Sequence, residues 1–184
     1  GGFYFGYGRP DGGFDPRWWY DGQNWSDDIG PEAFAHFRAY RKMPRARKQT
    51  EALPREQCWA TRVTDRAMRF LGERHDRPWF LTVSYDEPHQ PHMAPPEFYD
   101  RIDPGRLPLG PNSDAPLEGK PALQRLRRAR AVNSEEDIRA FQHGYWACMS
   151  YADDEIGRLL GRIDDDTVVV VTSDHGEMCA AHGQ

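Results

Sequence analysis

The stretch Thr167–Glu177, TVVVVTSDHGE, contains four consecutive valines followed by a cluster of polar side chains. An apolar run of this kind, without alternation, is typical of a strand buried on both faces inside a parallel sheet. The polar residues then fall at the carboxyl end of the strand, where open α/β sheets bind their ligands. We therefore predict an α/β fold with a ligand site directly after Ser173.

Asp174 and His175 are the candidate metal ligands, because they offer one carboxylate oxygen and one imidazole nitrogen. Gly176 allows the backbone to turn sharply after them. Two protein ligands are too few for a divalent ion, so further ligands would have to come from elsewhere in the protein. The Asp-His-Gly triplet is equally compatible with a solvated polar turn at the end of a strand.

A second apolar segment, Trp79–Tyr85, is followed by the polar residues 86–92, DEPHQPH. We expect it to form a second buried strand. If both strands run parallel in one sheet, their polar exits lie along the same edge.

His89 is the candidate catalytic residue in this second polar cluster. It stands between two prolines, which stiffen the backbone on both sides and present the ring in a fixed direction. Its imidazole can give a proton to a leaving oxygen or bind an anionic group; the alternative is a surface histidine in a rigid turn. His92 lacks this rigidity and is expected to be structural. Asp86 and Glu87 either orient His89 or are solvated.

The helices are predicted from apolar residues at helical spacing. We expect one helix over residues 56–74 and the strongest one over 134–163, where Ser134-Glu135-Glu136-Asp137 is a candidate capping box. Residues 120–130 predict a short basic helix, and residues 31–43 another short one. Residues 1–30 and 103–121, rich in glycine or proline, are expected to be irregular.

Composition excludes several classes of partner. With a net charge of -5 and a pI near 5.8, nothing points to nucleic acid or an anionic membrane. No apolar stretch approaches the ~20 residues of a membrane span. Three cysteines without metal-type spacing imply neither a disulfide framework nor a zinc site. The chain lacks an initiator Met and stops in a polar stretch, so we expect a piece of a longer protein. Compartment and oligomeric state stay open.

Three stretches, in this order and at this approximate spacing, resemble the sulfatase family of the alkaline phosphatase superfamily. The first resembles the family's strand and Pro-His-x-Pro loop, the second its long helix, and the third its Ser-Asp-His-Gly loop. They are residues 78–91 (PWFLTVSYDEPHQP), 144–158 (GYWACMSYADDEIGR) and 168–183 (VVVVTSDHGEMCAAHG). The resemblance covers residues 55–184 and extends more weakly to the aromatic segment 3–25.

The resemblance implies roles for the candidate residues. Asp174 and His175 would be metal ligands, and His89 would contact the sulfate or protonate the leaving group. The implied fold is a mixed, largely parallel sheet flanked by helices. Residues 1–184 would be part of a single catalytic domain, with 1–50 as an irregular segment and short helix and 55–184 as a portion of the α/β core. One divalent ion is implied, calcium being the usual one and manganese or zinc the alternatives.

The family's nucleophile is not found in this sequence. It is a formylglycine made from the first residue of a Cys/Ser-x-Pro/Ala-x-Arg element, which is expected upstream of residue 1. Cys58-Trp59-Ala60-Thr61-Arg62 fits that pattern only superficially, since Cys58 follows a basic segment rather than a buried strand, and we expect it to be structural. Residues 179–181, Cys-Ala-Ala, also depart from the Leu-Gly-Asp of many members.

We therefore expect a metal-dependent sulfatase acting on a small-molecule or saccharide sulfate ester when full length, with residues 1–184 inactive alone. One alternative is a phosphodiester or phosphonate monoester hydrolase of the same superfamily. An inactive or binding-only remnant is the alternative from another class.

Overall fold

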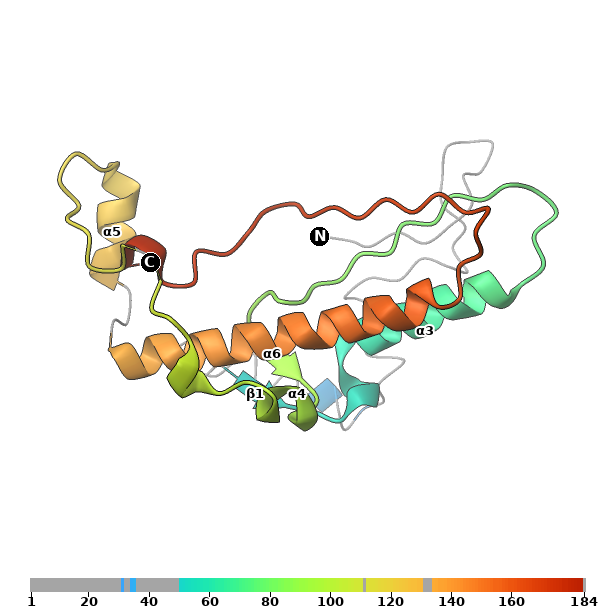
Figure 1. Ribbon diagram of the computed structural model, residues 1–184, viewed down its shortest axis with the longest axis horizontal. Helices are drawn as coiled ribbons and strands as arrows, with labels where there is room; N and C mark the ends of the chain where they lie inside the picture. Colours follow the sequence, from blue (N-terminus) through green and yellow to red (C-terminus); the bar gives the residue numbers. More distant parts are fainter. Residues whose placement is uncertain (1–30, 32–33, 36–49, 111, 131–133, 184) are drawn as a thin grey trace.

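Two helices, α3 (Trp59–Gly72) and α6 (Glu135–Leu160), form the body of the molecule and run side by side in the same direction (Figure 1). The structure is a computed structural model that describes residues 31, 34–35, 50–110, 112–130 and 134–183 (Figure 1). Helices α3 and α6 confirm the two main predicted helices, each slightly shorter than expected. The predictions for residues 1–30 and for most of 31–43 lie outside the described residues.

Helix α6 begins as its capping box predicts. The Ser134 hydroxyl accepts a hydrogen bond from the Asp137 backbone N–H at 3.0 Å, which satisfies one of the free donors of the first turn. Three acidic residues in that turn complement the positive end of the helix dipole. Arg139, one turn later, pairs with Glu135 and also donates to the carbonyl of Leu107 at 2.7 Å. Through Arg139, the first turns of α6 therefore bind the irregular segment that precedes α5.

The remaining elements are short. A parallel pair of strands, β1 (Thr50–Ala52) and β2 (His92–Ala94), aligns Thr50 with His92 and Ala52 with Ala94. Helix α5 (Ala122–Arg130) confirms the predicted basic helix, and the stretch before it is irregular as expected. The other elements are the short helix α4 (Pro96–Asp100) and the 3-10 turns η2 (Arg55–Gln57), η3 (Pro104–Arg106) and η4 (Ala181–Gly183). No helix in the described part of the chain is long and apolar enough to cross a bilayer.

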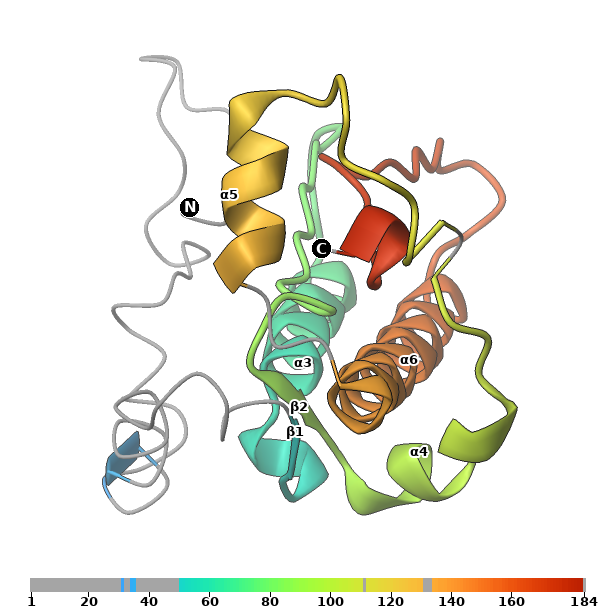
Figure 2. The same ribbon diagram turned by 90° about the vertical axis from the view of Figure 1, so that its left-hand side faces the viewer.

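The core lies on both sides of α6. One apolar cluster joins α3 to the end of α6 through Val63, Phe70 and Leu159. The other joins α6 to β2 and α4 through Ala94, Phe98 and Tyr151. Seen along the long axis in Figure 2, α3 and α6 lie next to each other, with β1, β2 and α4 beneath them. Helix α6 is thus the element that the rest of the described fold packs on.

The two predicted buried strands are the main correction. Neither Trp79–Tyr85 nor the valine run 168–171 pairs with another strand among the described residues, so the sheet shown there is only β1–β2. Val168 and Val170 are 90% and 81% exposed. The physical reason is that a strand needs a neighbouring backbone for its hydrogen bonds, and an apolar run alone does not supply one.

Residues 79–85 nevertheless lie in an extended form on the helices. Trp79, Leu81, Val83 and Tyr85 pack against the α3–α6 cluster, whereas Phe80 is 72% exposed. This period of two is the side-chain pattern of a strand with one covered face. The segment is therefore buried on one face and not, as predicted, on both.

Candidate functional site

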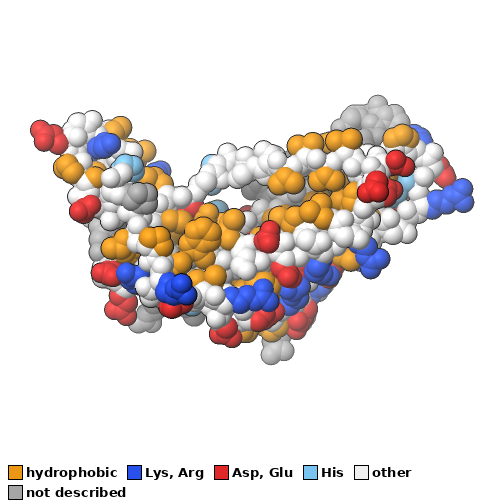
Figure 3. All heavy atoms as spheres, viewed as in Figure 1, with side chains coloured by type: hydrophobic (Ala, Val, Ile, Leu, Met, Phe, Trp, Pro, Cys, Tyr) orange, Lys and Arg blue, Asp and Glu red, His pale blue; other side chains and the backbone are white. Residues whose placement is uncertain are grey.

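The two polar clusters follow extended segments that lie on the same side of the helical layer. Residues 79–85 start after the C-terminal end of α3, and residues 167–173 start after the C-terminal end of α6. In Figure 1 both segments run in the same direction over the helices, and Figure 2 places both above the layer. In the space-filling view, apolar side chains gather along α6 and along the upper segment, with a hollow beside them (Figure 3). Both clusters therefore face the same open side.

His89 lies in a tight, exposed turn. Its backbone N–H donates to the carbonyl of Asp86 at 2.8 Å, and its ring Nδ1 lies against the carbonyl of Gln90. A carbonyl oxygen only accepts hydrogen bonds, so Nδ1 carries the hydrogen. The other ring nitrogen, Nε2, is then the atom that can bind an anion or hold a transferable proton.

The side chains of the neighbouring residues Asp174 and His175 lie close together. The Asp174 Oδ2 atom lies 3.5 Å from His175 Nε2, and both side chains are exposed. The second carboxylate oxygen, Oδ1, accepts from the His175 backbone N–H at 2.9 Å, while Nδ1 of the ring lies 3.0 Å from the Gly176 carbonyl. Because Nδ1 must donate there, neutral His175 keeps a lone pair on Nε2. One oxygen and one nitrogen are thus available on the same side.

The described residues do not complete a metal site around this pair. Within the described part of the chain, no group of three or more His, Cys, Asp or Glu side chains comes together to hold an ion. There is also no hydrogen bond or ion pair between His89 and either Asp174 or His175 among those residues. The donor types fit a divalent ion, but two ligands are fewer than such an ion needs.

The turn after His175 is fastened to α6 by a residue that the sequence did not single out. The buried Gln142 side chain donates through Nε2 to the carbonyls of Pro108, at 2.9 Å, and Cys179, at 3.3 Å. Cys179 and Ala180 have φ values of 45° and 70°, in the left-handed region that residues other than glycine adopt at a cost. The sequence offered one sign of this role: Gln142 is a polar residue on the apolar, buried side of α6.

Gly110 is needed where this turn meets the segment after η3. A Cβ atom placed on Gly110 would lie 2.4 Å from the backbone nitrogen of Ala181. We expect Gly110→Ala to displace the turn and lower the free energy of unfolding by about 1–3 kcal/mol, the usual range for overpacking. Urea denaturation and hydrogen exchange of residues 178–182 measure both effects.

The matched control is Gly157→Ala, because a Cβ atom there meets no atom within 4 Å. In α6 that change is expected to raise stability slightly, through the better helix propensity of alanine. Equal stability and equal exchange of the turn in the two variants would contradict the close approach at Gly110.

Cys58 behaves as the structural residue that we expected. The thiol is buried and lies against the carbonyls of Leu53 and Pro54. Burial, and then the nearby Glu87 carboxylate, raise the pKa of Cys58 far above its ordinary value. A thiol that stays protonated is a poor nucleophile, which argues against a catalytic role for the Cys-x-Ala-x-Arg stretch.

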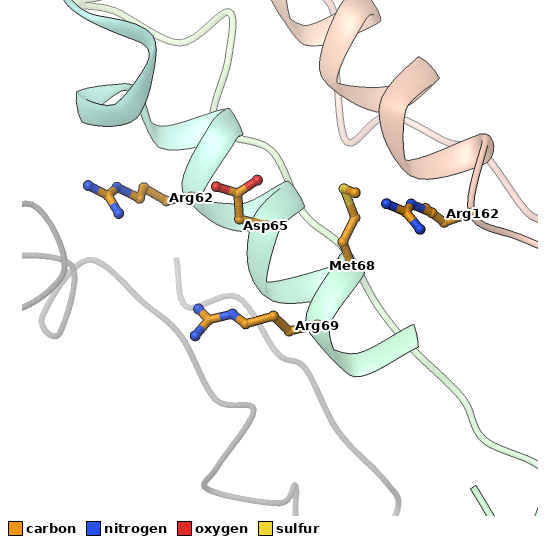
Figure 4. A pocket seen from close by; sticks show the side chains of 5 residues that line it. All are labelled: Arg62, Asp65, Met68, Arg69 and Arg162. Atoms are coloured by element: carbon orange, nitrogen blue, oxygen red, sulfur yellow. The ribbon is translucent and has the colours of Figure 1, made fainter. Parts of the chain in front are cut away.

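A basic hollow on α3 contains none of the predicted site residues. It is lined by Arg62, Asp65, Met68, Arg69 and Arg162. In Figure 4 the arginines of α3 point away from the helix axis, and Arg162 reaches in from the residues after α6. Asp65 also bonds to Arg158 at 2.8 Å, so part of this positive charge is already compensated within the protein.

Comparison with known proteins identifies the family. The chain matches the family model Sulfatase over residues 8–184. It therefore belongs to the sulfatase family, as the three motifs predicted. It is 32% identical to the uncharacterized sulfatase YidJ of Escherichia coli, over 97% of this chain and 37% of that protein.

Two further relatives have names that state an activity or a class. The chain is 30% identical to iduronate 2-sulfatase of Homo sapiens, over 66% of this chain and 26% of that protein. It is 28% identical to PehA of Trinickia caryophylli, a multifunctional alkaline phosphatase superfamily protein, over 76% of this chain and 31% of that protein. The chain thus spans well under half the length of each curated relative.

Proposed function

We propose that this chain is part of the catalytic domain of a metal-dependent sulfatase that hydrolyses a small-molecule or saccharide sulfate ester. Membership in the sulfatase family supports the reaction class. The observation that carries the proposal is the facing of Asp174 Oδ2 and His175 Nε2 at 3.5 Å in the Ser-Asp-His-Gly loop. In this proposal the formylglycine nucleophile lies outside residues 1–184, and the chain alone is inactive.

Asp174 and His175 are the proposed metal ligands, with calcium as the first candidate ion and manganese or zinc as alternatives. A divalent ion at this place would polarise the sulfate group under attack. The hydrogen bond to the Gly176 carbonyl, and then the Asp174 carboxylate, raise the pKa of His175. Since a metal binds the neutral imidazole, protonation competes with the ion, and binding should weaken as the pH falls.

His89 is the proposed proton donor to the departing alcohol. The S–O bond to the alcohol breaks as the nucleophile attacks sulfur, and the alcohol oxygen takes a proton from Nε2 of His89. In this role His89 starts as the imidazolium, protonated on both ring nitrogens, and ends as the neutral ring that keeps its hydrogen on Nδ1. The Nδ1 contact with the Gln90 carbonyl supports this assignment, because it leaves Nε2 as the reactive nitrogen. The same nitrogen could instead bind a sulfate oxygen, which is the substrate-binding role of this residue.

The fold proposal follows from the open faces of the two extended segments. We propose that residues 79–85 and 167–171 are strands of the mixed, largely parallel sheet of one catalytic domain, with residues 55–184 as part of its α/β core. The alternation along residues 79–85 leaves one face of that segment uncovered, and the valines are exposed. Both observations support the proposal, because a pairing strand or a covering layer would bury these side chains.

A phosphodiester or phosphonate monoester hydrolase is the second candidate function. The similarity to PehA, which is described as multifunctional within the alkaline phosphatase superfamily, favours keeping it. His89, Asp174 and His175 would serve either reaction, because sulfate and phosphate esters present similar anionic oxygens. An inactive or binding-only remnant would keep the ion and cleave neither ester.

The test uses the full-length protein, freed of metal and then supplied with calcium, manganese or zinc in turn. We expect at least one ion to restore cleavage of a nitrophenyl sulfate, and the Asp174→Ala variant to stay near background with the same ion. Cleavage of a phenylphosphonate ester in place of the sulfate would support the second candidate. Background rates with every ion and both esters would overturn both functions and leave the remnant.

A further inference from the structure

We propose that Glu87 positions His89. Its carboxyl group caps the N-terminus of α3 and so anchors the turn of residues 86–91, the His89 turn. The inference rests on the proposed function only in taking His89 as the proton donor. The juxtaposition itself joins two segments, the turn 86–91 and the start of α3, that the sequence separates by a whole helix.

Helix α3 begins without a cap of its own. Its N-cap residue, Cys58, makes no side-chain hydrogen bond to the first turn. The Ala60 N–H donates instead to Oε1 of Glu87 at 2.9 Å, and the Thr61 N–H donates to the Tyr151 hydroxyl at 2.7 Å. A carboxyl oxygen at a helix N-terminus satisfies a free donor and meets the positive end of the dipole. Glu87 therefore does for α3 what Ser134 does for α6, but from a distant segment.

The turn that carries Glu87 has little freedom between its anchor and His89. Only Pro88 lies between Glu87 and His89, and the His89 N–H is already bonded to the Asp86 carbonyl at 2.8 Å. On the far side, β2 begins at His92 and pairs with β1. The His89 turn is thus held at one end by a strand and at the other by the Glu87 carboxyl. Removing the Glu87 anchor frees the end nearest the imidazole.

The Glu87 carboxyl is more enclosed than the residue as a whole. Its Oε2 atom has no access to solvent and finds no hydrogen-bond partner among the described residues. The titratable groups that act with it are Asp86 in its own turn, Cys58 before α3, Tyr85, and Cys148, Tyr151 and Glu155 of α6. Burial, with Asp86 and Glu155 adding repulsion, raises the pKa of Glu87 to about 7. The carboxyl group thus exchanges its proton near neutral pH.

Because the Glu87 carboxyl is enclosed, it should make the stability of the protein depend on pH, which a contact on the surface would not do. The pKa of about 7 in the folded protein lies above the ordinary value of 4.5, so the folded state holds this proton more tightly than the unfolded state. Stability from this group is therefore present below about pH 4.5 and is lost as the pH rises to about 7. Glutamine keeps an acceptor oxygen for the Ala60 N–H and has no proton to lose.

The experiment compares Glu87→Ala, Glu87→Gln and the control Glu97→Gln in the full-length protein. Glu97 is an exposed acid in the first turn of α4. Hydrogen exchange measured by mass spectrometry reports on residues 59–62 and 86–92, and the folding equilibrium constant is measured from pH 5 to 8. Steady-state kinetics on a sulfate ester add kcat and KM across the same range.

For Glu87→Ala we expect exchange in both peptides to rise about tenfold or more and kcat to fall about tenfold, with KM within about threefold. For Glu87→Gln we expect protection in both peptides to be kept. Its folding equilibrium constant should gain on that of the wild type by up to about tenfold per pH unit between pH 5 and 7. Glu97→Gln should match the wild type in every measurement.

Unchanged exchange at residues 86–92 in Glu87→Ala would overturn the proposal. If that variant does not fold, a Glu87→Gln protein with the pH dependence of the wild type would overturn it as well. These readouts do not require turnover. A protein that cleaves no ester but shows the expected exchange would refute the proposed function and leave the anchoring of the turn intact.

Discussion

Replacing His89 by alanine should lower kcat of the full-length protein by about 10²- to 10⁴-fold, the usual contribution of a general acid. The variant loses Nε2, the ring nitrogen that the Nδ1 contact with Gln90 leaves available. The loss should depend on the leaving group. An alkyl sulfate releases a strongly basic alkoxide that needs a proton, whereas a nitrophenyl sulfate releases a stable phenolate. We expect the alkyl ester to show the larger loss.

The measurement is a pair of steady-state titrations, one with each ester, on wild type, His89→Ala and the control His143→Ala. The His143 ring, on α6, bonds to the carbonyl of Tyr99. We expect the His143→Ala substitution to leave kcat unchanged. Equal losses on the two esters would mean that His89 binds the anion and donates no proton. Wild-type rates on both would remove His89 from the mechanism altogether.

Replacing Glu155 by alanine should lower the free energy of unfolding by about 3 kcal/mol, at the lower end of the range for breaking a buried ion pair. The Glu155 side chain is fully buried and connects three elements. It accepts from Arg55 of η2 at 3.0 Å and from the Thr61 hydroxyl of α3 at 2.8 Å, and it also pairs with Arg158 of α6. We expect a value at the lower end of this range because neither arginine loses all its partners: Arg55 still pairs with Asp154, and Arg158 still pairs with Asp65.

Urea unfolding gives the free energy, and Asp154→Ala is the matched control. Asp154 is the neighbouring residue and pairs with the same arginine, but its side chain is 39% exposed. An exposed pair of this kind contributes about 0–1 kcal/mol. If the two alanine variants were equally stable, Glu155 would not be the centre of the contact between η2, α3 and α6.

The parts of the fold that follow from local chemistry could be predicted from the sequence. The start of α6 depends on Ser134 and Asp137, three residues apart, and the hydrogen bond between them is observed. Helix α3 depends on apolar residues at helical spacing, and Val63 and Phe70 of that pattern are fully buried. Neither inference needs knowledge of a distant segment, which is why both are confirmed.

The parts that depend on distant partners could not be predicted. Apolar spacing along residues 134–163 places Leu160 on the apolar face of α6, but Leu160 is exposed, while the polar residues Gln142 and Glu155 are buried. Their burial is possible because their hydrogen-bond partners come from segments about 35 and 100 residues away along the chain. No spacing rule within one helix contains that information.

The same limit applies to the candidate site. The sequence left Glu87 between two interpretations, orienting His89 or lying in solvent. The contact with Ala60 argues against the second, and it is a contact that the sequence does not reveal. Likewise, the valine run has the composition of a central strand, but composition does not state which backbone it pairs with. The roles of Asp174, His175 and His89 stay predictions until the assays above are done.

The open valine run also carries a hazard for the newly made chain. These four β-branched residues form an extended segment that contains no proline and pairs with no strand in the described part of the chain. Stretches of this kind allow identical chains to stack into fibrils. Three consecutive aspartates, residues 164–166, precede the run, and Asp174 follows it closely. Stacking in register would bring these like charges together. The acidic flanks therefore act against aggregation for as long as the valine run is unpaired.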